Sequence, residues 1–146
     1  MNYFYINTDT AALGYSPHAE WIKYDRAFTS GNAPDSYYKY GERVLGILTP
    51  GDMLFTYVSR RGVVAVGWVC EFWDRCAYRA RDRLVYRDTE YTEYRIGVDW
   101  CLKVVHNPVR PADLREIIGW TPIPTLQRIK DTDVAERLFE EIRDRV

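Results

Sequence analysis

Aromatic rings are the chemically distinctive side chains of this sequence. Aromatic residues make up 15% of its 146 residues, with 12 Tyr and 5 Trp. Flat rings can stack on a flat ligand, but the same rings also pack an ordinary core. Both interpretations stay open for Trp21 and Phe28, whereas Trp73, which directly follows an apolar run, favours a stacking role at a rim. Trp68 and Trp100 lie inside apolar runs, and we expect them in the core first.

Arginines gather in three places where they could contact phosphates. Arg60 and Arg61 form a short basic turn, residues 74–88 carry five arginines interleaved with tyrosines, and Arg128 and Lys130 come near the end. Positive side chains that follow a surface contact nucleic-acid phosphates and make binding sensitive to salt. The formal net charge of −1 and the aspartates inside the second group fit a solvated charged face equally well. Any affinity that depends on these charges is therefore expected to be modest.

No pattern typical of catalysis or metal binding occurs in the sequence. The two histidines, His18 and His106, are far apart and have no HExxH or HxH context. The three cysteines show no CxxC spacing, and Cys70 and Cys101 lie in apolar runs, where a thiol usually acts as a small hydrophobic side chain. We therefore expect no metal, no cofactor and no catalytic activity.

Length and composition indicate one globular domain over residues 1–146. The hydrophobic content is 47%, yet no apolar run approaches the length of a membrane span. The first residues lack the basic region and cleavage site of a signal peptide. We expect a cytoplasmic protein without membrane contact.

Periodicity and turn signals predict the elements that position these residues. Residues 50–72 begin with Pro-Gly-Asp, and two apolar runs flank a basic turn, which predicts a central antiparallel hairpin. Residues 2–7 and 91–105 alternate as strands, and a short strand is expected over residues 125–129.

Helical periodicity predicts short or peripheral helices between these strands. The predicted helical segments cover residues 19–27, 42–48, 111–119 and 133–146. Asp133 with Glu136 resembles a capping box at the start of the last helix. Residues 28–34 and 74–88 are expected to be irregular. Few strands and peripheral helices favour a small mixed β-barrel of the α/β (α+β) class.

Four sequence segments, in their order along the chain, resemble the EVE domain of the PUA-like superfamily, which also contains the YTH and ASCH domains. These segments are YFYINTD at 3–9, LTPGDMLFTYVSRRGVVAVGWV at 48–69, EYRIGVDW at 93–100, and TLQRI at 125–129 followed by a helix. YTH domains have a similar strand that ends in an Asp-Trp pair, here Asp99-Trp100. The resemblance covers nearly the whole chain and implies a small PUA-like mixed β-barrel with peripheral helices.

The resemblance also implies a function, which is to bind nucleic acid and hold one flipped-out, often methylated base between aromatic rings. EVE domains are associated with modified cytosine or adenine in DNA, commonly beside restriction nucleases, so a nuclease or another effector is a possible partner. Stacking returns ~1–3 kcal/mol per base, and polar groups must meet the base edge. The expected base-pocket residues are Asn7, Thr8, Trp21, Phe28, Ser30, Tyr40, Ser59, Trp73 and Trp100. The expected phosphate contacts are Arg60, Arg61, Arg79, Arg81, Arg128 and Lys130.

Three alternatives remain open. The first is an RNA-binding module like the PUA and YTH relatives, since nothing in the sequence detects a 2′-hydroxyl contact. The second is an ASCH-like hydrolase that acts on modified nucleosides; in that branch Lys and Glu do the chemistry, and Glu20 with Lys23 is the nearest local pair. The third is a protein-interaction module with the tyrosine-rich residues 37–40 as its contact face.

Overall fold

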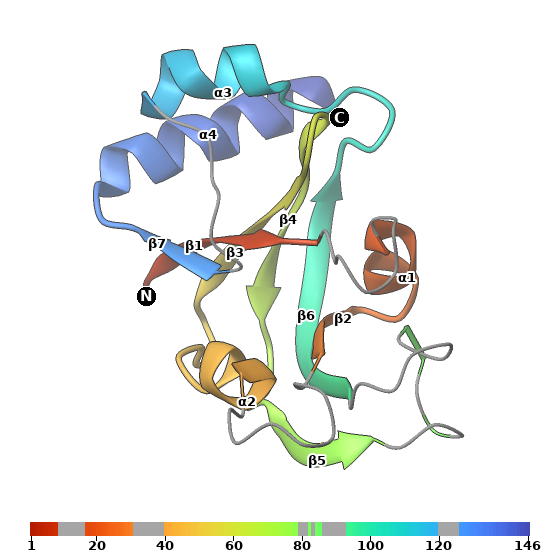
Figure 1. Ribbon diagram of the computed structural model, residues 1–146. Coiled ribbons are helices and arrows are strands. Elements are labelled where there is room, and N and C mark those ends of the chain that lie inside the picture. Colours follow the sequence, from red (N-terminus) through yellow and green to blue (C-terminus); the bar gives the residue numbers. More distant parts are fainter. Residues whose placement is uncertain (9–16, 31–39, 79–81, 83, 86–92, 120–125) are drawn as a thin grey trace.

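The structure is a computed structural model that describes residues 1–8, 17–30, 40–78, 82, 84–85, 93–119 and 126–146. Within this part of the chain, seven strands form one sheet and four helices pack around it (Figure 1). The strands are β1 (Tyr3–Asn7), β2 (Arg26–Ser30), β3 (Met53–Val58), β4 (Gly62–Val69), β5 (Asp74–Tyr78), β6 (Glu93–Lys103) and β7 (Leu126–Ile129). The helices are α1 (His18–Lys23), α2 (Tyr40–Leu45), α3 (Pro111–Ile118) and α4 (Thr132–Arg145).

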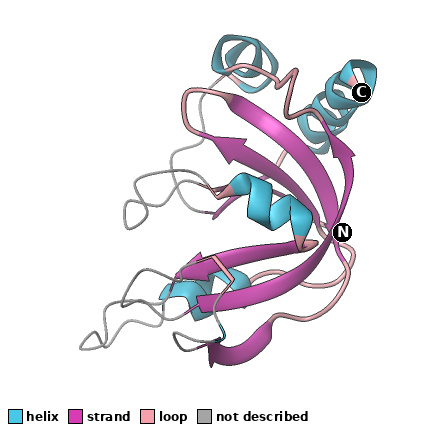
Figure 2. Ribbon diagram, turned by 90° about the vertical axis from the view of Figure 1, so that its right-hand side faces the viewer, coloured by secondary structure: helices cyan, strands magenta, loops and turns pink. Residues whose placement is uncertain are grey.

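The sheet is mixed and curled. Its strand order is β2-β6-β4-β3-β1-β7, and β5 pairs with β6 off this path. Strands β1 and β3 run parallel, and the other strand pairs are antiparallel. Figure 2 shows the strands of the sheet bending around a common interior. This arrangement confirms the expected small mixed barrel with peripheral helices.

The β3–β4 hairpin forms where the Pro-Gly-Asp signal and the two apolar runs predict it. Asp52 is buried, and its carboxylate accepts hydrogen bonds from the backbone N–H groups of Asn2 and Thr49, both at 3.0 Å. This carboxylate therefore joins the turn before β3 to the start of β1. At the hairpin tip, Gly62 has φ of 110°, and an added Cβ would lie 1.9 Å from the carbonyl oxygen of Val109. Only glycine can occupy that position without moving the backbone.

Two hydrophobic clusters lie on opposite faces of the sheet, because side chains alternate along each strand. One cluster, which includes Ile6 and Leu54, is covered by residues from α1 and α2. The other cluster, which includes Tyr5 and Phe55, is covered by α3 and α4. Burial raises the pKa of the Tyr5 phenol well above its usual value, which agrees with its place inside the second cluster.

The C-terminal helices begin and end at local signals. Helix α3 starts with Pro111 and stops at Gly119, which adopts a left-handed conformation with φ of 81°, as expected. The predicted capping box on Asp133 is wrong, because Asp131 is the N-cap of α4 and accepts a hydrogen bond from the Asp133 backbone N–H at 2.9 Å. No helix among the described residues is long and apolar enough to cross a membrane.

Two strands form where the sequence predicts none: residues 26–27 are predicted to end a helix, and residues 28–30 and 74–78 are predicted to be irregular. Residues 26–30 form β2, because Ala27, Phe28 and Thr29 find partners on β6 that are distant in sequence. Residues 74–78 form β5, which also pairs with β6. In both cases pairing with β6 outweighs weak local signals.

The expected burial also differs at three strand residues. Cys101 is exposed, because side chains alternate along β6: Asp99 and Cys101 lie on its outer face, and Trp100 lies on its inner face. Cys70 is also exposed, just after the end of β4. Trp68 is half-buried, on the α4 side of the sheet. Trp120, Tyr37 and Tyr38 lie outside the described residues.

Replacing Gly67 by alanine is expected to lower the free energy of unfolding by roughly 1–3 kcal/mol. An added Cβ would lie 2.4 Å from the carbonyl oxygen of Asp99 and 2.9 Å from Cα of Trp100, and these backbone atoms of β6 cannot move without disturbing the sheet. Urea denaturation would measure the loss.

Gly97→Ala is the matched control, because the three atoms nearest to the added Cβ all belong to the side chain of Glu71. That side chain is exposed and can rotate away, so the expected change is within about 0.5 kcal/mol. Equal losses for the two variants would contradict the backbone contact at Gly67.

Candidate nucleic-acid interface

The buried aromatics among the expected pocket residues lie in the cluster beneath α1 and α2. Trp21 is 1% exposed, Trp100 is 2% exposed and Phe28 is fully buried. The ring centroids of Trp21 and Phe28 are 6.3 Å apart. The indole N–H of Trp100 donates a hydrogen bond to the Arg26 carbonyl at 3.1 Å. This burial favours a packing role for all three rings.

Trp73 occupies a different position, at the edge of the same cluster. It comes just before β5, is half-buried, and packs against Tyr94 with ring centroids 6.1 Å apart. Among the tryptophans expected in the pocket, it is the one that has exposed surface in the described structure. Trp73 is therefore the ring best placed to stack on a ligand at this end of the barrel.

A fully buried carboxylate lies next to Tyr94. Glu93 accepts hydrogen bonds from the backbone N–H groups of Leu84 and Val85, at 3.0 and 2.6 Å. It also pairs with Arg95, whose Nε lies 2.8 Å from the same carboxyl group. Arg95 in turn donates to the carbonyl oxygen of Asp82 and lies 5.9 Å from the centroid of the Phe28 ring. We call this arrangement the Glu93 clamp, because it attaches Asp82, Leu84 and Val85 to β6.

The sequence analysis missed the clamp. Glu93 and Arg95 look like ordinary alternating residues of a strand, and only their pairing with β2 and with residues 82, 84 and 85 buries the carboxylate. A charged pair inside an apolar strand pattern is the one signal in the sequence that could have indicated it.

Two polar atoms near this end of the barrel are buried without a hydrogen-bond partner in the described part of the structure. They are Nε1 of Trp21 and Oγ1 of Thr29. Most buried polar atoms of native proteins have such a partner, so these two are candidates to meet a ligand or ordered water.

The strand registers separate the expected polar pocket residues into two groups. Asn7 is half-buried, Thr8 donates its hydroxyl to the Tyr57 carbonyl at 3.2 Å, and Ser59 is exposed at the end of β3. Ser30 instead pairs with Glu93 at the start of β6, the opposite end of the sheet. Tyr40 begins α2. The side chains of Ser30 and Tyr40 lie outside the described part.

The expected phosphate contacts are likewise separated. Arg60 and Arg61 are exposed at the hairpin tip, where Arg61 donates to the Val105 carbonyl at 2.7 Å and lies 3.3 Å from Nε2 of His18. Arg128 lies opposite Phe4, which aligns with Leu54 near the start of β3, so at 3.3 Å per residue it lies about 20 Å along the sheet from Arg60. Lys130 follows directly after the end of β7. Residues 79 and 81 (Arg79 and Arg81) are outside the described structure.

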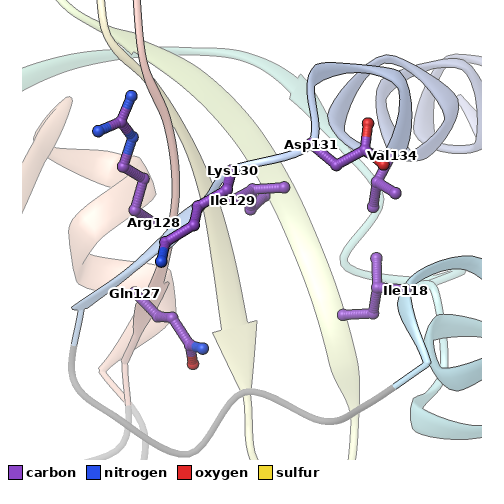
Figure 3. Close-up of a pocket in the computed structure, with 7 residues that line it drawn as sticks. All are labelled: Ile118, Gln127, Arg128, Ile129, Lys130, Asp131 and Val134. Atoms are coloured by element: carbon purple, nitrogen blue, oxygen red, sulfur yellow. The ribbon is translucent and has the colours of Figure 1, made fainter.

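Arg128 and Lys130 line a groove of about 440 Å³ beside β7, the edge strand of the sheet (Figure 3). We call it the β7 groove. Its apolar wall consists of Ile118, Ile129 and Val134, from α3, β7 and α4. The side chains of its polar part are Gln127, Arg128, Lys130 and Asp131. Arg128 also donates a hydrogen bond to Oδ1 of Asn2 at 2.9 Å, which holds its guanidinium against the start of β1.

Comparisons of the sequence alone find no relatives. No protein-family model matches the chain, and no curated protein is similar to it.

Solved structures with a similar fold do exist. A tyrosine-to-phenylalanine mutant of ZmASCH from Zymomonas mobilis is 11% identical to this chain and has a TM-score of 0.57. The match covers 96% of this chain and 98% of the ZmASCH chain. Rpa0253 from Rhodopseudomonas palustris is also 11% identical with a TM-score of 0.57, and the match covers 98% of this chain and 94% of the Rpa0253 chain. PSPTO5229 from Pseudomonas syringae is 13% identical and has a TM-score of 0.55, and the match covers 94% of this chain and 98% of that protein's chain.

These similarities define a class by fold. The curled mixed sheet with peripheral helices is similar in fold to ZmASCH and agrees with the PUA-like architecture that the sequence predicts. At identities this low the similarity extends to the fold alone, and function has to be argued from the site.

Proposed function

We propose that this chain is a nucleic-acid-binding module of the EVE type that reads a modified base, with DNA favoured over RNA. The observation that carries the proposal is the β7 groove, where two cations lie next to an apolar wall. Phosphate oxygens prefer Arg and Lys, and a base or sugar prefers an apolar surface, so the groove suits a nucleotide segment. The PUA-like fold supports the same class of ligand.

Trp73 is assigned the stacking role in this proposal. Its half-buried ring rests on Tyr94, and the Glu93 clamp holds the neighbouring strand in place. A base stacked there would recover part of the energy lost when it leaves the helix, ~1–3 kcal/mol. A methyl group would add roughly 0.8 kcal/mol if it is buried against an apolar wall.

The test is a titration of fluorescent oligonucleotides that carry 5-methylcytosine, 5-hydroxymethylcytosine, 6-methyladenine or no modification, as DNA and as RNA. We expect the double variant Arg128→Ala, Lys130→Ala to weaken binding to every oligonucleotide by about 10-fold and to reduce the salt slope by about 2. Arg137→Ala, which removes a single positive charge at an exposed site on α4, is the control for a loss of charge away from the groove.

Trp73→Ala should act differently, because a stacking residue affects the bound base rather than the phosphates. We expect it to weaken binding to the modified oligonucleotide by about 10-fold and to leave the salt slope unchanged. If no oligonucleotide binds the unaltered protein, or if Arg137→Ala acts like the groove variant, the proposal is wrong.

An ASCH-like hydrolase is the second candidate, and the similarity to ZmASCH is what favours it. Glu20 is half-buried and Lys23 is exposed on α1, where its Nζ lies 5.3 Å from the Tyr24 ring, with no ion pair between Glu20 and Lys23 in the described structure. Incubation with methylated or acetylated nucleosides, followed by chromatography, distinguishes the two candidates. Turnover that is lost in Lys23→Ala would favour the hydrolase.

A further inference from the structure

A second cavity lies on the other side of the sheet from α1 and α2, between the sheet and α4. Its volume is about 270 Å³, and we call it the α4 pocket. The sheet contributes Tyr3, Met53 and Trp68, and Met1 lies beside them; α4 contributes Glu136, Phe139, Glu140 and Arg143. A cavity of this size suits a small group rather than a large ligand.

The inner walls of the α4 pocket are aromatic or contain sulfur. Tyr3 and Met53 are buried, while Trp68 and Phe139 are half-buried and thus keep exposed ring surface. Trp68 pairs with Met53 across the β3–β4 ladder, so both side chains face α4. Ring faces held in this way attract cations through their negative quadrupole.

The outer rim carries two carboxylates that form no ion pair in the described structure. Glu136 and Glu140 are exposed, one helical turn apart on α4, and neither forms an ion pair within the described structure. Like charges at this spacing destabilise a helix. The same helix does form an ion pair one residue further on, where Glu141 lies 2.8 Å from Arg145. The rim therefore keeps a negative potential, which Arg143 only partly offsets.

From this geometry we propose that the α4 pocket binds a methylated or quaternary ammonium group. Aromatic faces and methionine methyl groups contact the N-methyl groups, and the two carboxylates balance the charge. A phosphate would be repelled by the same carboxylates, so the α4 pocket differs in ligand class from the β7 groove. The proposal does not depend on the proposed nucleic-acid function.

The test is a titration of the whole protein with tetramethylammonium chloride, monitored by tryptophan fluorescence and NMR. Sodium chloride at equal ionic strength is the reference. We expect saturable binding in the millimolar range. The double variant Glu136→Gln, Glu140→Gln should weaken it about 5-fold, because the rim then loses both charges. Trp68→Leu should abolish it, and its melting temperature shows whether the variant is folded.

Controls separate this proposal from simpler explanations. Glu116→Gln, at an exposed site on α3, should leave binding unchanged. The neutral isostere 3,3-dimethyl-1-butanol should bind at least 5-fold more weakly than choline, because it has the same shape without the charge. Equal binding of the two, or a preference for guanidinium, would overturn the proposal.

The same ammonium group occurs in small molecules and in methylated lysine side chains. Choline and a peptide that contains trimethyllysine are therefore titrated in parallel, with the unmethylated peptide as reference. Tighter binding of either ligand than of the unmethylated peptide supports the proposal and identifies the source. Binding of the unmethylated peptide at equal affinity would overturn it.

Discussion

Replacing Glu93 by alanine is expected to lower the free energy of unfolding by about 3–5 kcal/mol. Glu93 is fully buried, and its carboxylate satisfies the backbone N–H groups of Leu84 and Val85 as well as the guanidinium of Arg95. Removal of the carboxylate leaves that largely buried guanidinium and two N–H groups without their acceptor. Urea denaturation monitored by circular dichroism measures the loss.

Glu71→Gln is the matched control for this prediction. Glu71 also pairs with an arginine, since its Oε1 lies 3.5 Å from Arg26, but both side chains are well exposed. An exposed pair contributes only about 0–1 kcal/mol, so the control should unfold almost like the unaltered protein. Similar losses in Glu93→Ala and Glu71→Gln would show that the Glu93 clamp has no special structural role.

Replacing Trp21 by alanine is expected to cost about 3–5 kcal/mol of stability, through the cavity that the missing indole leaves. Trp21 is 1% exposed and packs beside Phe28 within the cluster under α1 and α2. Trp73→Ala should cost less, because Trp73 is only half-buried at the edge of that cluster. Calorimetry of both variants measures the difference.

This prediction decides how the binding data are read. A loss of nucleic-acid binding in Trp21→Ala is expected to follow unfolding, whereas a loss in Trp73→Ala at an unchanged melting temperature would place the stacking site at Trp73. If Trp21→Ala instead keeps its stability and loses binding, the indole belongs to a ligand pocket and the packing role assigned to it is wrong.

Elements with strong local signals could be predicted from the sequence. The Pro-Gly-Asp turn and the two apolar runs specified β3 and β4, and the alternation over residues 91–105 specified β6, which covers Glu93–Lys103. Pro111 and Gly119 marked the ends of α3. These signals depend on a few neighbouring residues, and their conformational preferences persist without the rest of the chain.

The sites depend on contacts that no local pattern specifies. The Glu93 clamp needs residues 82, 84 and 85 to lie against β6, and the β7 groove needs Ile118, Ile129 and Val134 from three elements. The α4 pocket joins Tyr3 to residues more than 130 positions later in the chain. Likewise, residues 26–30 became a strand only through β6, and the expected pocket residues were divided between the two ends of the sheet. Composition and periodicity thus determined the fold class and which aromatic and charged residues are present. Long-range strand pairing, which buries some of these side chains and exposes others, decided which of them meet.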